Sequence, residues 1–325
     1  MKMALLNYSV AALLLAGALS SGRASLTLTG DVDLRYKAFI LASHWGGLEA
    51  LGLSARKTFA DSRGDRWTLY GIAEVKSNLS DVMLHEAWVK YKGPLGVWNL
   101  TAGRIRLPFG LLSGFSDDRL LYHSLEESSL GFDADNGLMF SGIAPGFDYS
   151  LSFTQGLGHL PIDKLGKGFA TGRIGFQVGE FTDGSLGFSA AAGSTAGHVE
   201  TSTSMGDHSQ VEGMTMYTAR YLFAADYTSY FGQATGRAEV VGGMVDEDVY
   251  LGAFGSIDYA LSSKTVITGA VTVSSHRSSF DDEWFCGISY SPAWVTLRAG
   301  YTYSHFKEKN HAISLQAYRL FSATF

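Results

Sequence analysis

The chain has 325 residues, of which 46% are hydrophobic and only 17% are charged, with 39 glycines and a formal net charge of −6. Ordinary soluble domains carry about 25% charged residues and about 7% glycine, so this chain is poor in charge and rich in glycine. The composition excludes a disordered, collagen-like or disulfide-rich protein, and the acidic balance without a basic patch argues against nucleic-acid binding. Beyond the N-terminus, no stretch approaches the roughly 20 apolar residues that a membrane-spanning helix needs.

The first 24 residues have the pattern of a secretory signal peptide. Lys2 gives a positive start, residues 10–19 form an apolar run, and residues 22–24 place small side chains before a cleavage site. The run is too short to serve as a membrane anchor. We therefore expect residues 1–24 to be removed and residues 25–325 to form an exported, acidic protein.

The mature chain opens with an alternating segment over residues 26–38. Apolar residues hold one face, and the other face carries four charges, on Asp31, Asp33, Arg35 and Lys37. Strands of soluble proteins usually run about five or six residues, whereas about 9–11 residues cross a bilayer as a tilted strand. The same alternation recurs along the chain. Apolar-out and polar-in over about ten residues is typical of an outer-membrane barrel.

This alternation predicts an all-β fold, a transmembrane antiparallel β-barrel of about 16 strands, with about 14 or 18 strands as alternatives. In chain order, the predicted strands are 26–38, 44–58, 66–77, 82–91, 97–106, 135–143, 147–157, 168–178, 185–195, 214–223, 227–241, 249–259, 265–274, 283–290, 294–304 and 311–325. Short turns, among them residues 224–226, alternate with long connections at about 107–134, 158–167 and 196–213. We expect the short turns to face the periplasm and the long connections to lie outside the cell.

The last predicted strand alternates up to Phe325. A phenylalanine that ends such a strand is similar to the signal by which outer-membrane barrels are recognised, so we expect Phe325 to be recognised by the barrel-assembly machinery. Outward aromatic residues near the strand ends, such as Tyr36, Trp284 and Tyr303, are expected to contact the lipid and lipopolysaccharide of the outer membrane.

The longest connection follows the fifth predicted strand. It begins with the run GRIRLPFGL at residues 103–111 and leads to Asn136 and Gly137. Between His85 and Gly142 the chain resembles the porins, and most closely the phosphate-selective porin family, in which a G-x-x-x-x-P-F-G-L run leads into an inward-folded third external loop. The resemblance implies the same inward-folded loop in this chain, and a channel function.

A barrel of about 16 to 18 strands leaves an aqueous channel, so charges that face the interior or lie in the third loop are candidate pore residues. The acidic candidates, all in or beside this loop, are Asp117, Asp118, Glu126, Glu127, Asp133 and Asp135. The basic candidates are Arg35, Lys37, Lys76 and Lys90 on the strands, with Arg104 and Arg106 at the loop root. Parity also places Arg173, Arg220, Arg237 and Arg298 on the inner face. An acidic loop that faces a basic wall would set up a transverse field that orders polar solutes.

Two features depart from the simplest pattern. The acidic loop differs from the dense ladder of basic residues on which the anion selectivity of the phosphate-selective family rests. Arg104 and Arg106 share the parity of the outward residues Leu100 and Ala102, so a bulge near Gly103 is needed to turn them inward.

These patterns predict a porin for passive diffusion of small hydrophilic solutes or ions in the outer membrane of a Gram-negative-type bacterium. The alternative is a barrel sheath that encloses an exported electron-transfer cytochrome. We expect no enzyme, because the histidines are scattered and no Gly-x-Ser-x-Gly motif accompanies them. We expect no cofactor and no metal site, because the acidic clusters 246–248 and 281–283, placed in external loops, lack the spacing of a cation-binding loop.

The oligomeric state is open between a homotrimer and a monomer. Porins that this chain resembles often form trimers in which the second external loop reaches a neighbour, but here that loop, near residues 78–81, is short. Small residues predicted on the outer face could form a flat interface or face lipid: Gly71, Ala73, Ala190, Ala192, Ala234 and Gly236.

Overall fold

The structure is a computed structural model that describes most of the chain after residue 23. The described residues are 24–39, 44–61, 64–76, 81–113, 120–125, 130–158, 166–179, 183–197, 216–277, 279–305 and 309–325. The predicted signal peptide, apart from Ala24, lies outside them. Within the described ranges, no helix combines the length and the hydropathy needed to cross a membrane.

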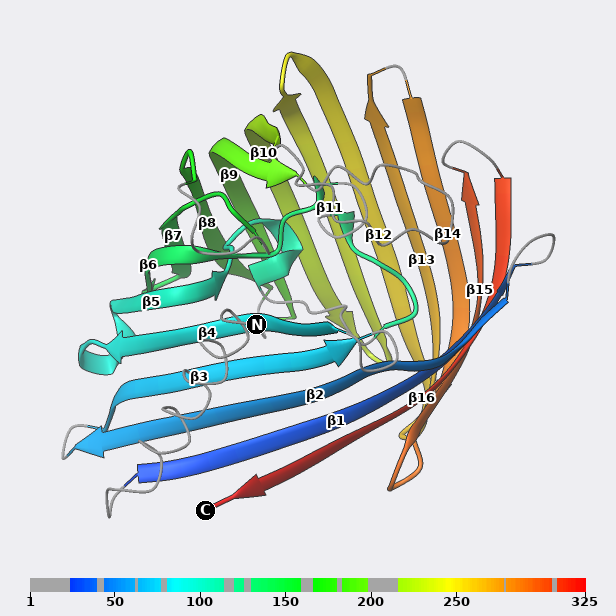
Figure 1. Ribbon diagram of the computed structural model, residues 1–325, viewed down its shortest axis with the longest axis horizontal. Coiled ribbons are helices and arrows are strands. Elements are labelled where there is room, and N and C mark those ends of the chain that lie inside the picture. The colour runs from blue at the N-terminus through cyan, green and yellow to red at the C-terminus, as the bar shows by residue number, and fades with distance from the viewer. Residues whose placement is uncertain are drawn as a thin grey trace.

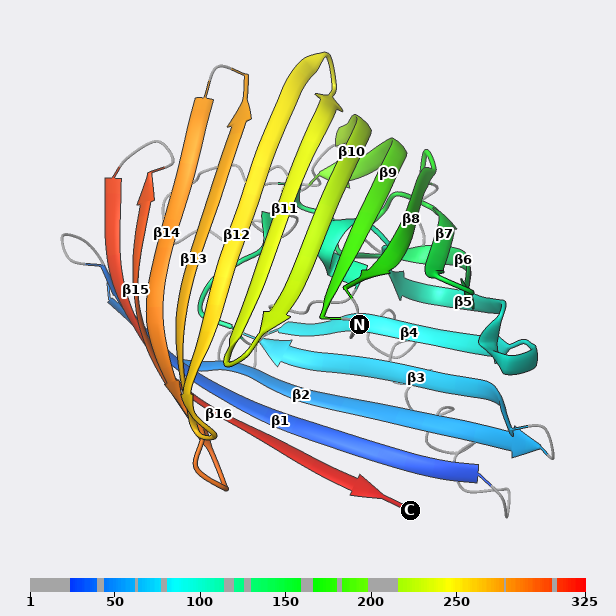
Figure 2. The same ribbon diagram turned by 180° about the vertical axis from the view of Figure 1, so that it is seen from behind.

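Sixteen antiparallel strands form one closed barrel (Figures 1 and 2), which confirms the predicted fold and strand number. In chain order the strands are β1 (Ala24–Phe39), β2 (His44–Asp61), β3 (Gly64–Lys76), β4 (Asp81–Lys92), β5 (Asn99–Arg106), β6 (Ala134–Ala144), β7 (Phe147–Thr154), β8 (Phe169–Val178), β9 (Gly184–Gly197), β10 (Met216–Phe231), β11 (Ala234–Val245), β12 (Asp248–Ser262), β13 (Thr265–His276), β14 (Ser279–Tyr290), β15 (Thr296–His305) and β16 (Lys309–Thr324). Short 3-10 turns are also present at Pro94–Gly96 and Gly110–Ser113.

The first and last strands close the barrel. β1 pairs with β16 from Thr27 opposite Thr324 to Phe39 opposite Ala312. We call the end of the barrel at which β1 begins the turn end, and the opposite end, where the chain leaves β5, the loop end. Closure pairs the edge strands with each other, so their backbone groups are satisfied without water, as a bilayer requires.

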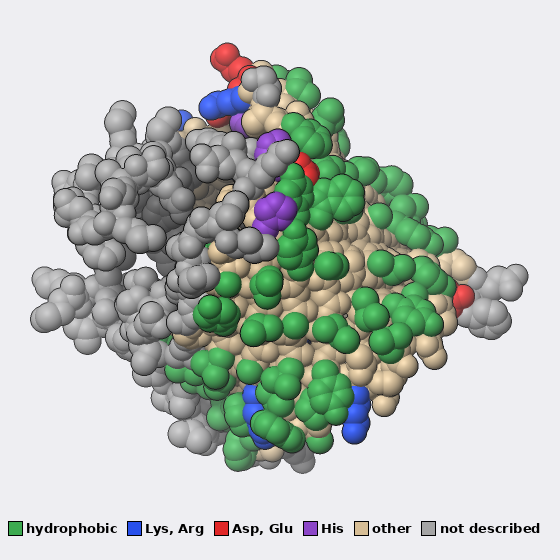
Figure 3. Space-filling view, turned by 90° about the vertical axis from the view of Figure 1, so that its right-hand side faces the viewer, with side chains coloured by type: hydrophobic (Ala, Val, Ile, Leu, Met, Phe, Trp, Pro, Cys, Tyr) green, Lys and Arg blue, Asp and Glu red, His purple; other side chains and the backbone are tan. Residues whose placement is uncertain are grey.

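The wall follows the alternation seen in the sequence. On β1, Leu34 and Tyr36 are exposed on the outside of the barrel. Asp33, which directly precedes Leu34, is completely buried on the inside. Figure 3 shows one side of the outer wall, where hydrophobic side chains spread over the surface and acidic and basic side chains lie only near its margins. A contiguous apolar surface of this extent is unfavourable in water and suits contact with lipid.

One predicted turn is wrong. The sequence suggested a break at residues 224–226, but β10 runs without interruption from Met216 to Phe231, and the turn into β11 lies at Gly232 and Gln233. Asp226 faces inward and binds Arg173 with a 2.7 Å ion pair, so it is one polar position of the alternation rather than a turn residue. Gly232 adopts a positive φ of 61°, a conformation that glycine reaches without strain.

One predicted external loop is also wrong. Residues 281–283 belong to β14, which begins at Ser279. Their alternation continues that of the strand, because Asp282 and Trp284 lie on the outer face and hydrogen-bond to each other, while Phe285 is buried inside. The cluster is therefore split between the two faces of the wall.

The third loop, which we define as residues 107–133 between β5 and β6, folds into the barrel. Figures 1 and 2 show the described parts of this segment inside the ring of strands. Its buried residues are Leu107, Phe109, Leu111, Tyr122, Leu125, Leu130 and Phe132, and they pack against the inner residues Phe169, Ala191, Leu222, Val241, Tyr250, Phe254 and Phe285. The predicted inward-folded loop is thereby confirmed, and the hydrophobic core of the protein lies within the lumen between this loop and strands β8 to β14.

Candidate pore constriction

The third loop is anchored on the far wall by hydrogen bonds as well as by apolar packing. The backbone N–H of Gly110 donates to Ser189 Oγ on β9 at 2.9 Å, and that of Leu111 donates to Glu239 Oε1 on β11 at 3.2 Å. Further along the loop, Thr272 Oγ1 on β13 donates to the carbonyl of His123 at 3.3 Å. The apolar part of the inner wall is therefore covered by the loop.

Aromatic contacts support the same anchor. The Tyr122 ring lies 5.2 Å from the Phe285 ring, centroid to centroid, and 6.3 Å from the Phe254 ring. At the other end of the loop, the Phe132 ring lies 5.4 Å from both the Phe109 and the Phe169 rings in edge-to-face geometry. Aromatic pairs of this kind stabilise by about 0.5–1.5 kcal/mol beyond the apolar area that they bury.

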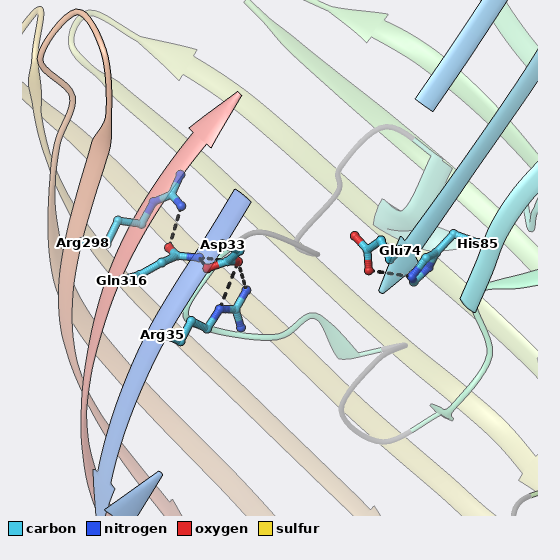
Figure 4. Close-up of polar contacts among 6 residues, drawn as sticks. All are labelled: Asp33, Arg35, Glu74, His85, Arg298 and Gln316. Atoms are coloured by element: carbon cyan, nitrogen blue, oxygen red, sulfur yellow. Dashed lines mark hydrogen bonds and ion pairs between the residues drawn. The ribbon is translucent and has the colours of Figure 1, made fainter. Parts of the chain in front are cut away.

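A polar network, which we call the seam network, joins β15, β16 and β1 on the inner wall (Figure 4). Its centre is Asp33, whose side chain is 0% exposed. Arg35 donates to Asp33 Oδ2 at 3.0 and 3.2 Å, and Gln316 Nε2 donates to both carboxylate oxygens at 2.9 and 2.8 Å. Arg298 Nη1 in turn donates to Gln316 Oε1 at 2.7 Å. Two guanidinium groups are thus linked to one carboxylate across the strands that close the barrel.

A second polar pair lies on β3 and β4, apart from the seam network in Figure 4, and β2 lies between β1 and β3 in the barrel. His85 Nε2 is 2.8 Å from Glu74 Oε2, and the Glu74 side chain is only 2% exposed. The register shifts at this point, because Ile72 pairs with Glu86 while Ala73 pairs with Leu84, which leaves His85 as the extra residue of a bulge. A bulge re-aims the side chain and the carbonyl of the extra residue, and both are used here.

Arg104 is buried at the root of the third loop, with 7% of its surface exposed. Its guanidinium donates to the carbonyls of His85, Gly158 and Ala134 at 2.9, 2.5 and 3.5 Å. Arg104 therefore ties the start of the loop to the bulge in β4, to the start of β6 and to the connection after β7. Its contacts are those of a structural clamp.

Asp135, at the other side of the root, is 1% exposed and also binds backbone. Its carboxylate accepts hydrogen bonds from the N–H groups of Gly156, Leu157 and Gly158. A carboxylate that accepts several backbone N–H groups holds the segment that donates to it. Asp135 and Arg104 thus share Gly158 as a partner and fix the connection between β7 and β8 against the loop root.

Arg106 is the more exposed arginine of the pair. Its Nε lies 3.4 Å from Asp133 Oδ1 and 3.6 Å from Glu86 Oε1, and about 20% of its side chain is exposed. The root closes beside it, where the N–H of Leu107 donates to the carbonyl of Asp133 at 2.8 Å. A cavity of about 190 Å³ also borders Arg106, Glu86 and Lys90.

The expected bulge at Gly103 is absent, since β4 and β5 pair in one register from Ala87 opposite Arg104 to Lys92 opposite Asn99. Gly103 instead adopts an unusual backbone conformation within β5, with a φ of 127°. A Cβ on this glycine would lie 2.3 Å from the carbonyl oxygen of Ala87, so only glycine fits between the two strands. The irregularity that the sequence placed in β5 lies in β4 instead.

The remaining candidate residues are spread along the wall. Lys90 lies 5.0 Å above the Trp88 ring, and Lys37 lies 5.2 Å from the Phe39 ring near the loop end. Lys76 is the last residue of β3, and its side chain lies outside the described part of the structure. The loop acids Asp117, Asp118, Glu126 and Glu127 also lie outside the described residues.

The inward arginines of β8 and β11 form ion pairs near the turn end. Arg173 binds Asp226 at 2.7 Å, and Arg237 Nη1 binds Asp258 Oδ2 at 2.6 Å. Arg35 and Arg106 also contact carboxylates, whereas Arg104 contacts backbone carbonyls and Arg220 donates to the Thr195 hydroxyl. The described inner wall is consequently a mosaic of paired charges rather than a purely basic surface.

Sequence reasoning missed Glu74, His85 and Gln316. The inward parity of Glu74 and Gln316 was visible in the alternation, but their partners lie on neighbouring strands and depend on the register. His85 owes its position to the bulge, for which the sequence carries no signal. Arg298, in contrast, lies on the inner wall as its parity predicts.

The Phe325 backbone pairs with Leu26 in both directions, at 3.0 and 2.8 Å, and its side chain is 74% exposed. The terminal ring therefore projects from the turn end of the seam between β1 and β16. Recognition of this ring during assembly stays a prediction.

The closed barrel, its apolar outer wall and its inward-folded third loop together define the architecture of a 16-stranded outer-membrane barrel of the porin type. No protein-family model matches the sequence, and no curated protein matches it. Solved structures do match the fold. A trimeric form of in-vitro folded OmpT, an outer-membrane protein of Vibrio cholerae, has a TM-score of 0.70 at 11% sequence identity, over 92% of this chain and 100% of that chain.

Two further structures agree with this. The anion-selective porin from Comamonas acidovorans has a TM-score of 0.68 at 14% identity, over 92% of this chain and 100% of that one. The outer-membrane channel DcaP of Acinetobacter baumannii has a TM-score of 0.65 at 11% identity, over 93% of this chain and 99% of that one. At such low identity the likeness shows a shared fold. It does not confirm the resemblance to the phosphate-selective family.

Proposed function

We propose that this protein is an outer-membrane porin through which small hydrophilic solutes and ions diffuse passively, without chemical change. The observation that carries the proposal is the division of the inner wall. Strands β8 to β14 offer an apolar seat that the third loop covers, whereas β1, β15 and β16 carry the charged seam network. Charged and hydrogen-bonding side chains along a narrow passage favour hydrated solutes over apolar ones.

Weak ion selectivity follows from the pairing of the described charges. Arg35 contacts Asp33 directly, and Arg298 is linked to Asp33 through Gln316. Arg106 lies between Glu86 and Asp133. Paired charges create strong fields over a few ångströms but little net potential at a distance. We therefore propose weak cation or mixed selectivity rather than the strong anion preference of a basic ladder.

Export and assembly belong to the same proposal. A cleaved signal peptide would bring the chain to the periplasm of a Gram-negative-type cell, and the barrel-assembly machinery would recognise Phe325 and insert the barrel among lipid and lipopolysaccharide. A homotrimer is the proposed assembly, and the trimeric form of OmpT from Vibrio cholerae supports it by analogy of fold. Cross-linking in native membranes followed by electrophoresis should give a ladder that ends at three subunits.

The alternative function, a sheath around an electron-transfer cytochrome, needs an open lumen. The third loop packs its apolar residues into that lumen and is anchored on β9, β11 and β13. This arrangement favours the porin. Co-purification of a haem protein with the barrel from native membranes would favour the sheath.

A planar-bilayer recording tests the porin function directly. The refolded protein, checked for the barrel fold by its heat-dependent electrophoretic mobility, should give discrete conductance steps in 1 M KCl. The same preparation after boiling is the control and should give none. A correctly folded barrel that never conducts would contradict the proposal.

A further inference from the structure

A cavity of about 370 Å³ opens on the inner wall at the loop end, outside the constriction described above. Strands β10 to β14 and their turns form it, and its charged and aromatic lining consists of Arg220, Asp246, Tyr250, His276, Arg277 and Asp281. Its volume is within the range of about 300–1,000 Å³ that is usual for small-molecule sites. Both positive and negative side chains line it. The charged groups that have no ion-pair partner therefore decide which kind of ligand can bind there.

Arg220 offers an anion-binding guanidinium. Its Nε donates to Thr195 Oγ1 at 2.7 Å, and its Cζ lies 5.7 Å from the ring centroid of Phe132 at the end of the third loop. These contacts fix the plane of the group. Within the described residues no carboxylate is hydrogen-bonded to it, so its two Nη atoms are left to bind a carboxylate in bidentate fashion.

Arg277 is held between two carboxylates at the rim. Arg277 Nη2 lies 3.4 Å from Asp246 Oδ2, and its Nε donates to Asp248 Oδ2 at 2.7 Å. Asp246 also accepts the N–H of Ala219 at 3.0 Å. These three groups are satisfied by contacts within the chain, and together they leave one negative charge at the rim.

Asp281 supplies the opposite charge. It pairs with Ser274 in the register of β13 and β14, and Ser274 is buried on the inner face, so Asp281 faces the cavity. Within the described part of the chain its carboxylate has neither a hydrogen bond nor an ion pair. The cavity therefore carries an available cation on β10 and an available anion on β14.

The spacing of these two charges selects the ligand. β10 and β14 are separated by four strand intervals of about 4.8 Å, or about 19 Å across the strands, and the register places Asp281 level with Ala224, about 14 Å along β10 from Arg220. The long arginine side chain covers part of this separation. The charges of a single α-amino acid are too close together to reach both groups. The termini of a peptide of two or three residues are separated by about 7–11 Å when extended.

Resting on the porin function, we propose that this cavity is a vestibule subsite for short zwitterionic peptides, whose carboxylate binds Arg220 and whose ammonium group binds Asp281. The subsite would concentrate such peptides above the constriction. Sugars are disfavoured, because the Tyr250 ring is only 2% exposed and offers no open face for stacking.

Interruption of the single-channel current by trialanine, added at the loop end, tests the subsite. The wild type should show concentration-dependent current blocks. Arg220→Gln and Asp281→Asn should each weaken trialanine binding about tenfold, as expected for one lost charge-assisted contact. Arg319→Gln, an exposed site on β16 away from the cavity, is the matched control and should bind as the wild type does.

Blocked peptides separate the two contacts, because each of them lacks one of the two charged ends. N-acetyl-trialanine lacks the ammonium group, so its binding should fall with Arg220→Gln and be unchanged by Asp281→Asn. Trialanine amide should show the reverse. Equal blocking by all three peptides, or by maltose, would overturn the subsite.

The two proposals fail in different ways. A wild type that conducts but whose current trialanine never interrupts would overturn the subsite and leave the porin function intact. A folded wild type that does not conduct contradicts the porin function and the subsite with it.

Discussion

Asp33 organises three strands through one carboxylate. Arg35, from the same strand, and Gln316, from β16, both donate to it, and Gln316 passes the contact on to Arg298 of β15. A buried carboxylate with this many hydrogen-bond donors holds them in place. Removal of its charge should therefore affect both the stability of the barrel and the charge of the pore.

Asp33→Asn should lower the free energy of unfolding by about 1–3 kcal/mol. Arg35 loses its ionic partner, and the Gln316 amide, which donates to both oxygens of Asp33, loses one of its two acceptors. The free energy is measured by urea unfolding in lipid vesicles, followed by tryptophan fluorescence. The reversal potential in a KCl gradient should also shift toward anion selectivity. Asp183→Asn, at an exposed turn, makes the same charge change away from the network and should alter neither quantity.

The arginines at the loop root have different environments despite their similar position in the sequence. Arg104 is surrounded by backbone carbonyls, whereas Arg106 lies beside two carboxylates and is partly exposed. The contacts of Arg104 are structural, and we propose that Arg106 contributes to the field at the constriction.

Arg106→Gln should shift the reversal potential toward cation selectivity, because Glu86 and Asp133 lose their positive partner. The shift should be largest in dilute salt, since the Debye length falls from about 30 Å at 0.01 M to about 3 Å at 1 M. Arg104→Gln should leave selectivity nearly unchanged and lower the free energy of unfolding by about 1–3 kcal/mol, since it orphans backbone acceptors. Equal shifts in selectivity for the two variants would contradict this division.

At the scale of elements, the third loop behaves as an internal hydrophobic core. A 16-stranded barrel has no core of its own when its lumen is full of water, and here the loop creates one by packing on β8 to β14. Its anchors combine three hydrogen bonds to the wall with the ring contacts of Tyr122. The position of the loop, and with it the width of the passage, depends on these contacts.

Tyr122→Ala combined with Leu125→Ala should release the middle of the loop from the wall. Each deleted side chain is buried, and truncation of such residues costs about 2–5 kcal/mol. Single-channel recordings should show a noisier open channel with a changed conductance. Phe140→Ala removes an aromatic ring from the lipid-facing side and is the control, whose channel should match the wild type.

At the scale of the whole molecule, barrel closure depends on the pairing of β1 with β16. The backbone of Phe325 completes this seam by pairing with Leu26, and its ring contributes nothing to the pairing. Folding and recognition by the assembly machinery can therefore be separated at this residue.

Phe325→Ala should reduce the amount of barrel in the outer membrane of cells several-fold while the purified chain refolds in detergent as the wild type does. The folded fraction is read from heat-dependent mobility in both settings. Phe321→Ala, another exposed phenylalanine of β16, should assemble normally. Normal assembly of the Phe325 variant would remove the terminal ring from the recognition signal.

The sequence alone determined the class of fold, the number of strands and the faces of most residues. These follow from local physics, since a period of two along each strand dictates which side chains face lipid. The inward third loop was implied by the resemblance of residues 85–142 to the porins. The alternation failed where a polar residue inside a long strand looked like a turn, as at Asp226, and where acids such as Asp281 looked like a loop.

The tertiary structure alone decided which charges meet. Contacts such as Asp33 with Gln316, or Arg104 with the His85 carbonyl, join residues on different strands and depend on register, on closure and on a bulge that no local pattern announces. The sequence predicted separate acidic and basic surfaces, but among the described residues the closed barrel brings several of these charges into ion pairs, as with Arg35, Arg106 and Asp133. The physical reason is that alternation fixes the face on which a side chain lies, whereas the register of the neighbouring strand decides which residue lies beside it.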